Sequence, residues 1–244
     1  VEDNADLRIF IAKNLKTDYN VVEAIHGQMA IELVKNCFFD LIITDIMMPN
    51  VDGVELCNIL KSNINYCHIP IILLTAKNSI ESKIEGYKTG ADDFIEKPFD
   101  MELLQTRILN LIDSRIKLKQ LFSSELIIDP SKTTTNSLDE EFLKKAIDVV
   151  ENNYSNSRFG VEEFVEKMCV SRSLLHKKLS VITDQSASTF ITSFRLKKSI
   201  SLLKSHKDNI SQIAYDVGFN DPKYFSRIFK KNYGLTPTDY QNKK

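Results

Sequence analysis

Residues 40–53 read DLIITDIMMPNVDG, and this stretch organises the first half of the chain. The apolar run at 41–43 is too short for a helix, and it leads to Asp45 at the edge of a loop that contains Pro49 and Gly53. Open α/β sheets place their chemistry just outside the carboxyl ends of their strands. A lone aspartate here is also typical of a residue that caps a turn or a helix. The residues at the ends of the neighbouring strands therefore indicate whether Asp45 is a cap or part of a chemical site.

Polar residues stand at the ends of three further strand-like segments. Glu2 and Asp3 open the chain, Thr75 ends the apolar run 71–74, and Lys97 follows a short apolar segment. Together with the aspartate of the quoted stretch, these positions offer carboxylates, a hydroxyl and an ammonium. A nucleophile, ligands for a cation and donors to phosphate oxygens are what a phosphoryl-transfer site requires.

Short β-branched segments alternate with amphipathic segments as far as residue 113. The predicted strands are 19–24, 41–44, 71–74 and 93–96, and the predicted helices are 7–15, 30–34, 54–60, 80–87 and 101–112. This alternation predicts right-handed crossovers and a doubly wound parallel sheet with helices on both faces. Val1 has the place of the last residue of a further, first strand that is largely missing. We therefore expect the sequence to lack several residues of the natural domain.

The first 115 residues resemble the receiver domains of two-component systems. Four separated elements occur in the order and at the intervals of that family. They are Glu2-Asp3, Asp45 followed by Met-Met-Pro, Thr75-Ala76, and Lys97-Pro98-Phe99. The resemblance implies a flavodoxin-like fold, a cis peptide before Pro98, and phosphorylation of Asp45 by a histidine kinase or phosphotransfer domain.

The resemblance also implies a role for each site residue. Asp45 is the phosphoacceptor, while the Thr75 hydroxyl and the Lys97 ammonium donate to phosphoryl oxygens. Mg²⁺, which prefers hard oxygen ligands, is expected at the carboxylates of Glu2, Asp3 and Asp45 and the carbonyl of Met47. Thr75 and Phe94 would be switch residues, with Phe94 turning inward; plain core packing is the alternative for Phe94.

Charge and composition separate the chain into an acidic and a basic part. Residues 1–113 hold 10 Lys and Arg against 18 Asp and Glu, whereas residues 139–244 hold 18 against 13. We expect a receiver domain at 1–115, a linker at 116–138, and a second domain at 139–244. The spacing of Ser137 and Glu140 predicts a capping box at the start of the second domain. An acidic half and a basic half favour a cation and a polyanion, respectively, as partners.

The second half contains only helical patterns, in short pieces. The predicted helices are a first one through residue 152, then 161–168, 172–179, 187–203, 210–217 and 222–232. Helix, tight turn, helix occurs twice, once at Cys169-Val170 and once at Gly218, and each second helix is basic. Ser171 and Asp221 are placed to cap those second helices. This all-α pattern predicts two helix-turn-helix motifs; a helical bundle with solvated lysines is the alternative.

Residues 142–242 resemble the AraC/XylS-type DNA-binding domain. The motifs that carry the resemblance are Gly218-Phe219, Tyr224-Phe225, Phe229-Lys230 and Gly234-Leu235-Thr236-Pro237. It implies that both recognition helices enter successive major grooves of double-stranded promoter DNA. The residues expected to face DNA are Arg172, Ser173, His176, Lys177, Lys223, Tyr224 and Arg227. Arg195, Lys197 and Lys198 of the connecting helix are expected to meet phosphates or solvent.

These features predict a non-enzymatic, phosphorylation-dependent transcription regulator. We expect a homodimer when it is phosphorylated, with RNA polymerase as a further partner. One alternative is the C-terminal part of a membrane hybrid sensor kinase, phosphorylated within the same polypeptide. An aspartyl-phosphate phosphatase is a second alternative, but it needs an acid where Met47 stands. A scaffold receiver that is not phosphorylated is disfavoured, because the five expected site residues are all present: Glu2, Asp3, Asp45, Thr75 and Lys97.

Compartment follows from composition. No apolar run approaches the roughly 18 residues of a membrane span, and no signal peptide opens the sequence. Each of the four cysteines is expected to be a buried thiol in a reducing compartment, because none forms a Cys-x-x-Cys pair. We therefore expect a cytoplasmic location, or the cytoplasmic part of a membrane-bound hybrid protein.

Overall fold

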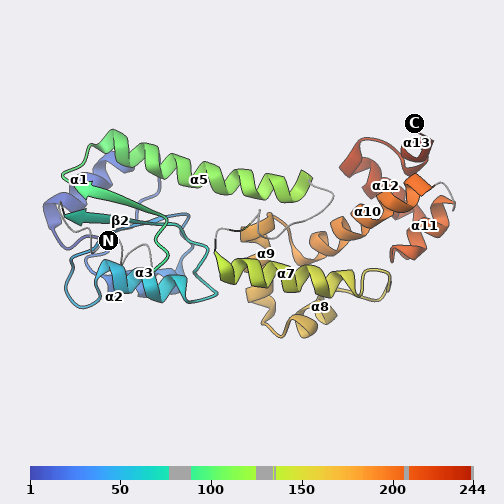
Figure 1. Cartoon of the computed structure of the whole chain (residues 1–244), viewed down its shortest axis with the longest axis horizontal. Coiled ribbons are helices and arrows are strands. Elements are labelled where there is room, and N and C mark those ends of the chain that lie inside the picture. The colour runs from blue at the N-terminus through green and yellow to red at the C-terminus, as the bar shows by residue number, and fades with distance from the viewer. Residues whose placement is uncertain (77–88, 125–133, 135, 206–208, 243–244) are drawn as a thin grey trace. The chain divides into compact units, whose positions relative to one another are not determined.

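The computed structural model describes residues 1–76, 89–124, 134, 136–205 and 209–242 (Figure 1). The chain forms two compact units. The first comprises residues 1–121 and 133–139, and the second comprises residues 122–132 and 140–244. Within the described part of the chain, no helix combines the length and the apolar character of a membrane span.

A parallel sheet forms the centre of the first unit. Its described strands are β1 (Ile42–Asp45), β2 (Ile71–Ala76) and β3 (Asp93–Lys97), in the order β1-β2-β3. β2 is buried from Ile71 to Thr75. A continuous apolar run of this kind is typical of a strand in a parallel sheet that is covered on both faces.

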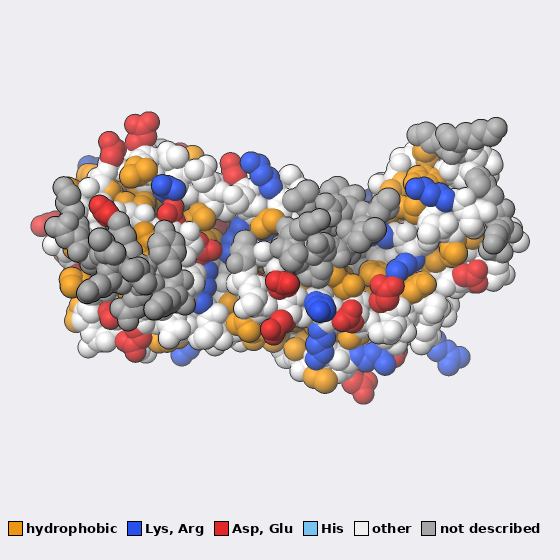
Figure 2. All heavy atoms as spheres, in the orientation of Figure 1, with side chains coloured by type: hydrophobic (Ala, Val, Ile, Leu, Met, Phe, Trp, Pro, Cys, Tyr) orange, Lys and Arg blue, Asp and Glu red, His pale blue; other side chains and the backbone are white. Residues whose placement is uncertain are grey.

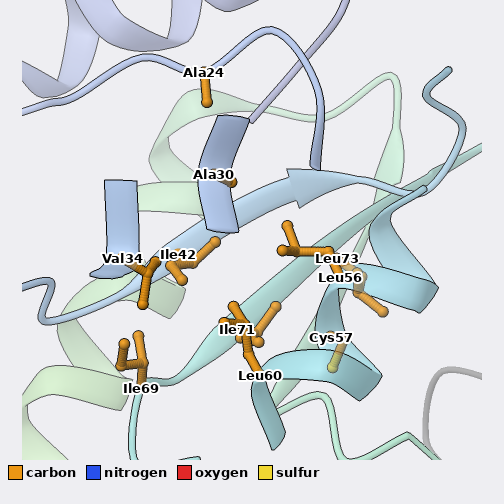
Figure 3. Close-up of a cluster of buried hydrophobic side chains, with 10 residues drawn as sticks. All are labelled: Ala24, Ala30, Val34, Ile42, Leu56, Cys57, Leu60, Ile69, Ile71 and Leu73. Carbon is orange, nitrogen blue, oxygen red and sulfur yellow. The ribbon is translucent and has the colours of Figure 1, made fainter. Parts of the chain in front are cut away.

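Helices cover both faces of this sheet. They are α1 (Ala5–Leu15), α2 (Gly27–Asn36), α3 (Gly53–Lys61) and α5 (Met101–Ser124). Alternate side chains of a strand point to opposite faces. Ile71 and Leu73 accordingly pack with residues of α2 and α3 (Figure 3), while the other face of β2 packs with α1 and α5. The doubly wound arrangement predicted from sequence is therefore confirmed.

One predicted strand differs from the structure, and two further predicted segments lie outside the described residues. Residues 19–24 form no strand. Only Val1 and Glu2 lie between them and β1: the Val1 nitrogen lies 2.7 Å from the Ile43 carbonyl, and Glu2 N–H donates to Ala24 at 3.0 Å. So short a neighbour cannot supply a ladder of hydrogen bonds. The predicted helix 80–87 and the extended segment predicted around residues 126–130 lie outside the described residues.

The second unit is helical, as predicted. Its helices are α7 (Ser137–Glu151, which begins in the first unit), α8 (Val161–Met168), α9 (Arg172–Thr183), α10 (Ala187–Ser205), α11 (Ile210–Asp216), α12 (Pro222–Tyr233) and α13 (Pro237–Asn242). The capping residues of α9 and α12 are confirmed, because Ser171 accepts from Leu174 N–H and Asp221 accepts from Lys223 N–H. The short α13 was not predicted.

The start of α7 corrects the predicted capping box. Asn136, not Ser137, accepts a hydrogen bond from the Asp139 N–H at 2.8 Å, and its own amide donates to the Asp139 carboxylate at 2.6 Å. The reciprocal pair therefore begins one residue earlier than the Ser-x-x-Glu spacing predicts. Asparagine serves as well as serine at this position, so spacing alone does not choose between the two.

Candidate functional site

Three carboxylates converge at the carboxyl end of β1. Oxygen atoms of Glu2, Asp3 and Asp45 lie within 4.8 Å of one another. Glu2 and Asp45 are buried, whereas Asp3 is exposed. Asp45 N–H donates to the Val1 carbonyl at 3.0 Å, which joins the start of the chain to the end of β1. The structure thus brings Asp45 together with two acids that lie more than forty residues earlier in the sequence.

Lys97 completes this cluster from the end of β3. Its Nζ lies 2.8 Å from Glu2 Oε2 and 2.9 Å from Asp45 Oδ2. The peptide bond that follows, from Lys97 to Pro98, is cis as expected. One ammonium that pairs with two of the three carboxylates leaves excess negative charge on the cluster. Closely spaced hard oxygen atoms with excess negative charge fit a Mg²⁺ ion.

Thr75 and Phe94 lie near this edge of the sheet in different settings. Thr75 is fully buried, and its hydroxyl donates to the Ala76 carbonyl at 2.9 Å. Ala76 pairs with Lys97 in the β2–β3 register. Thr75 therefore lies one residue before the position of β2 that is paired with Lys97. Phe94 is half-buried, pairs with Leu73, and packs against the core between the sheet and α2–α3.

A hollow of about 840 Å³ opens beside the carboxylates. Met47, which is 75% exposed, and Asp3 both line it. The other lining residues are Ile46, Met48, Pro49, Asp52, Val54, Glu55, Asn58 and Thr89. The exposed acid of the cluster is therefore open to a reactant from this side.

Two further residues hold the cluster in place. Arg8 of α1 donates from Nη1 to the carbonyls of Glu2 at 2.8 Å and Asp3 at 3.3 Å. Gly53, at the start of α3, lies so close to β1 that a Cβ there would be 2.0 Å from the Asp45 carbonyl oxygen. The sequence analysis treats Gly53 only as a loop marker and does not single out Arg8. No sequence pattern points to Arg8, because its acceptors are backbone carbonyls.

On α9, most of the residues predicted to face DNA are exposed. Arg172, Ser173 and His176 are exposed, while Lys177 is half-buried. The Arg172 guanidinium lies 3.3 Å from Glu162 of α8. Burial, with a smaller contribution from the adjacent Lys178, lowers the pKa of Lys177. The first motif thus presents three of its four predicted residues to solvent.

On α12, all three predicted residues are exposed. Lys223, Tyr224 and Arg227 lie on its outer side, whereas Phe225 and Phe229 are fully buried. The Arg227 guanidinium lies over the Tyr224 ring, 5.4 Å from its centre. On the face shown in Figure 2, acidic and basic side chains alternate over this unit and form no single-sign patch. On this face, no basic patch marks the candidate interface.

The connecting helix α10 departs from expectation. Arg195 was expected to meet phosphates or solvent, but its guanidinium donates to three backbone carbonyls within the unit. Lys198 forms an ion pair with Glu151 of α7. Arg195 thus points toward the connection between α7 and α8, and Lys198 points toward α7, because both lie on the inward side of α10 near the buried Phe194. Spacing along the helix did not reveal that this face is inward.

The cysteines are only partly as predicted. All four are free; Cys57 and Cys67 are buried, but Cys37 and Cys169 are exposed. Cys37 follows the end of α2, and Cys169 ends α8 in a left-handed conformation. Both exposed thiols therefore lie at helix ends, where a side chain leaves the packed face.

Comparison with known proteins agrees with both units. The response regulator receiver domain family matches residues 1–109, and a helix-turn-helix domain family matches residues 164–243. The chain is 44% identical over 243 residues to histidine kinase P4 of Formosa agariphila, an alignment that covers 100% of this chain and 18% of that protein. The chain therefore spans less than a fifth of that relative.

Two further proteins are similar over shorter stretches. Response regulator ArlR of Staphylococcus aureus is 33% identical over 153 residues, which cover 62% of this chain and 68% of ArlR. The solved receiver domain of a signal transduction histidine kinase from Syntrophus aciditrophicus is 32% identical, with a TM-score of 0.45, and covers 46% of this chain and 86% of that one. The chain belongs to the two-component response regulators, with a receiver domain followed by an AraC-type helix-turn-helix domain.

Proposed function

We propose that the chain is a DNA-binding regulator controlled by phosphorylation of Asp45, and not an enzyme. In this proposal residues 1–115 accept the phosphoryl group, residues 116–138 link the domains, and residues 139–244 bind promoter DNA. The observation that carries the proposal is the cluster of Glu2, Asp3, Asp45 and Lys97 in the same chain as two helix-turn-helix motifs.

The proposed chemistry is a transfer from a phosphohistidine to Asp45. An Asp45 carboxylate oxygen bonds to phosphorus, the phosphorus–nitrogen bond breaks, and the histidine nitrogen keeps the electron pair. Glu2, Asp3, Asp45 and the Met47 carbonyl would hold Mg²⁺, which would neutralise charge shared by the carboxylates and the incoming phosphoryl group. Lys97 already lies 2.9 Å from Asp45, so it can donate to a phosphoryl oxygen after a small movement.

The switch that follows is proposed to use Thr75 and Phe94. A hydroxyl and an ammonium that donate to the phosphoryl group contribute roughly 1.5–3 kcal/mol each. Thr75 must first give up its 2.9 Å bond to the Ala76 carbonyl, which reduces its net share. A full reversal of a two-state equilibrium needs about 5.5 kcal/mol. We propose that dimerisation supplies the remainder and that Phe94 turns into the space that Thr75 leaves.

Phosphorylation with acetyl phosphate and Mg²⁺ tests the acceptor. The whole chain should gain one phosphoryl group by mass spectrometry, and Asp45→Asn should gain none. Asp52→Asn is a matched control, because Asp52 is an exposed carboxylate that lines the same hollow. Equal labelling of wild type and Asp45→Asn would overturn the assignment.

Magnesium titration tests the ligand set. Lys97 Nζ now contacts two proposed ligands, so Lys97→Met should tighten Mg²⁺ binding in calorimetry by removing a competing cation. Asp3→Asn should weaken it by removing a ligand. The combination of weaker binding in Lys97→Met and unchanged binding in Asp3→Asn would exclude this site.

A second candidate places the same functions within a larger hybrid sensor protein, with the phosphodonor in the same polypeptide. The specific observation in its favour is the alignment of the entire chain to a histidine kinase of which it spans 18%. Sequencing the coding DNA upstream would decide between the two. An in-frame kinase domain would support the hybrid, and a nearby start codon would support a separate regulator.

A further inference from the structure

Arg195 of α10 is turned into the second unit and donates to one short segment of backbone. Its Nε donates to the Tyr154 carbonyl at 2.9 Å, and its Nη2 donates to the carbonyls of Asn156 at 2.9 Å and Phe159 at 3.2 Å. All three acceptors lie between α7 and α8. Burial lowers the pKa of Arg195, yet an arginine stays charged in proteins. A charged fork therefore clamps this connection.

The two ends of the clamped segment belong to different hydrophobic cores. Tyr154 packs against the core formed by α10, α11 and α12. Phe159 is buried against Phe164 of α8, with ring centres 6.0 Å apart, and Phe164 stacks on Phe190 of α10. The segment thus passes from the core beneath the second helix-turn-helix motif to the core beneath the first.

The turn of the second motif packs against the same segment. Gly218 has φ +86°, and a Cβ there would lie 2.0 Å from the Tyr154 carbonyl oxygen and 2.9 Å from Arg195 Nε. The carbonyl that accepts from Arg195 is therefore also the one that approaches Gly218. One guanidinium contacts backbone that is packed against both motifs.

We propose that Arg195 is a positioning residue that sets the spacing and orientation of recognition helix α9 relative to α12. The inference rests on the proposed DNA-binding function, because spacing matters only if both helices read one duplex. Two linked binding modules gain about 10²–10⁴ in avidity when their geometry fits both sites, and they lose that gain when it does not. The role is therefore distinct from contact with a phosphate and from local capping of α7.

A distance measurement without DNA tests the geometry itself. Spin labels on the exposed Cys169, before α9, and on Lys231→Cys, near the end of α12, report the separation in a Cys37→Ser background. Cys57 is buried, and burial raises its pKa, so this thiol should stay unlabelled. The parent should give one narrow distance distribution.

Arg195→Met should broaden or shift that distribution. Arg158→Met is the matched control, because Arg158 is exposed and lies in the same connecting segment. Arg195→Lys should give an intermediate width, since one ammonium cannot reproduce the planar fork. If Arg195→Met lowers the helical signal in circular dichroism, this variant is partly unfolded. Arg195→Lys alone then tests the proposal. Widths and means equal to those of the parent would overturn the proposal.

Binding to DNA supplies the functional arm. The probes are the tightest duplex that the wild type selects from a random library, and the same duplex with one half-site scrambled. Arg195→Met should weaken binding to the intact duplex about tenfold and leave the scrambled duplex unchanged. The dependence of log affinity on log salt should keep its slope.

The possible outcomes separate the two claims. A slope that falls by about one would mark Arg195 as a phosphate contact and overturn the positioning role. An equal loss on both duplexes would also overturn it. If the wild type selects no duplex, the proposed DNA-binding function fails, while the distance measurement still judges the clamp.

Discussion

The turns of the two helix-turn-helix motifs each hold a residue in the left-handed conformation, Cys169 with φ 57° and Gly218 with φ 86°. Cys169 is exposed, so its side chain has room although the backbone is strained. Gly218 lies against the Tyr154 carbonyl, where any Cβ would collide. The same backbone conformation is therefore a local matter in the first motif and a packing requirement in the second.

Substitution of Gly218 should give the largest effect on stability. Gly218→Ala adds left-handed strain of about 1–2 kcal/mol and an overpacking cost of about 1–3 kcal/mol, so the free energy of unfolding should fall by about 2–5 kcal/mol. Urea unfolding measures this change. Gly234→Ala is the control: its φ is +75°, but a Cβ there would meet nothing within 4 Å. It should cost only the strain, and equal losses would contradict a special contact at Gly218.

Arginine substitutions compare the outer faces of the two motifs. Arg227→Ala should weaken binding to the selected duplex by about 1–3 kcal/mol, the range for a bidentate contact to a base. Arg172→Ala should cost less, because Arg172 must leave its ion pair with Glu162 to reach DNA. Mobility shifts with matched and mutated duplexes measure both. Wild-type affinity and specificity in Arg227→Ala would remove this residue from the interface.

The smallest effect is expected at the first turn. Cys169→Gly relieves left-handed strain of about 1–2 kcal/mol. It also raises the backbone entropy of the unfolded chain, which lowers the free energy of unfolding by about 0.5–1 kcal/mol. The net should be a gain of roughly 0.5–1 kcal/mol in the free energy of unfolding. Cys169→Ala, which keeps the strain, is the reference. A loss of stability in Cys169→Gly would show that the Cys169 side chain has a role of its own.

Local patterns were enough to predict much of the fold. The apolar runs that become β1 and β2 are bounded by polar residues, so both the strands and the edge that collects Asp45 and Lys97 could be read from the sequence. α8 was predicted with its observed limits, because its apolar residues recur at helical spacing between Gly160 and the turn at Cys169.

The rest depended on tertiary neighbours that no local pattern contains. Residues 19–24 have strand-like composition but form no strand, because strand pairing depends on a neighbouring segment; Glu2 N–H donates to the Ala24 carbonyl there. Arg195 is a basic residue of the kind that contacts DNA. Its side chain instead binds backbone carbonyls of residues 154–159, which lie far from it in the sequence. Arg8 was missed for the same reason, since its acceptors are backbone carbonyls, which have no sequence signature.

We propose above all that a phosphoryl group on Asp45 changes the affinity of the second unit for DNA. The most direct test of this proposal is the affinity of the whole chain for the selected duplex with and without beryllofluoride and Mg²⁺, in wild type, Asp45→Asn and the control Asp52→Asn. Coupling between two sites is typically 5–150-fold, so we predict a tightening of about tenfold in wild type and Asp52→Asn and none in Asp45→Asn. Unchanged affinity in wild type, or equal tightening in Asp45→Asn, would contradict the account.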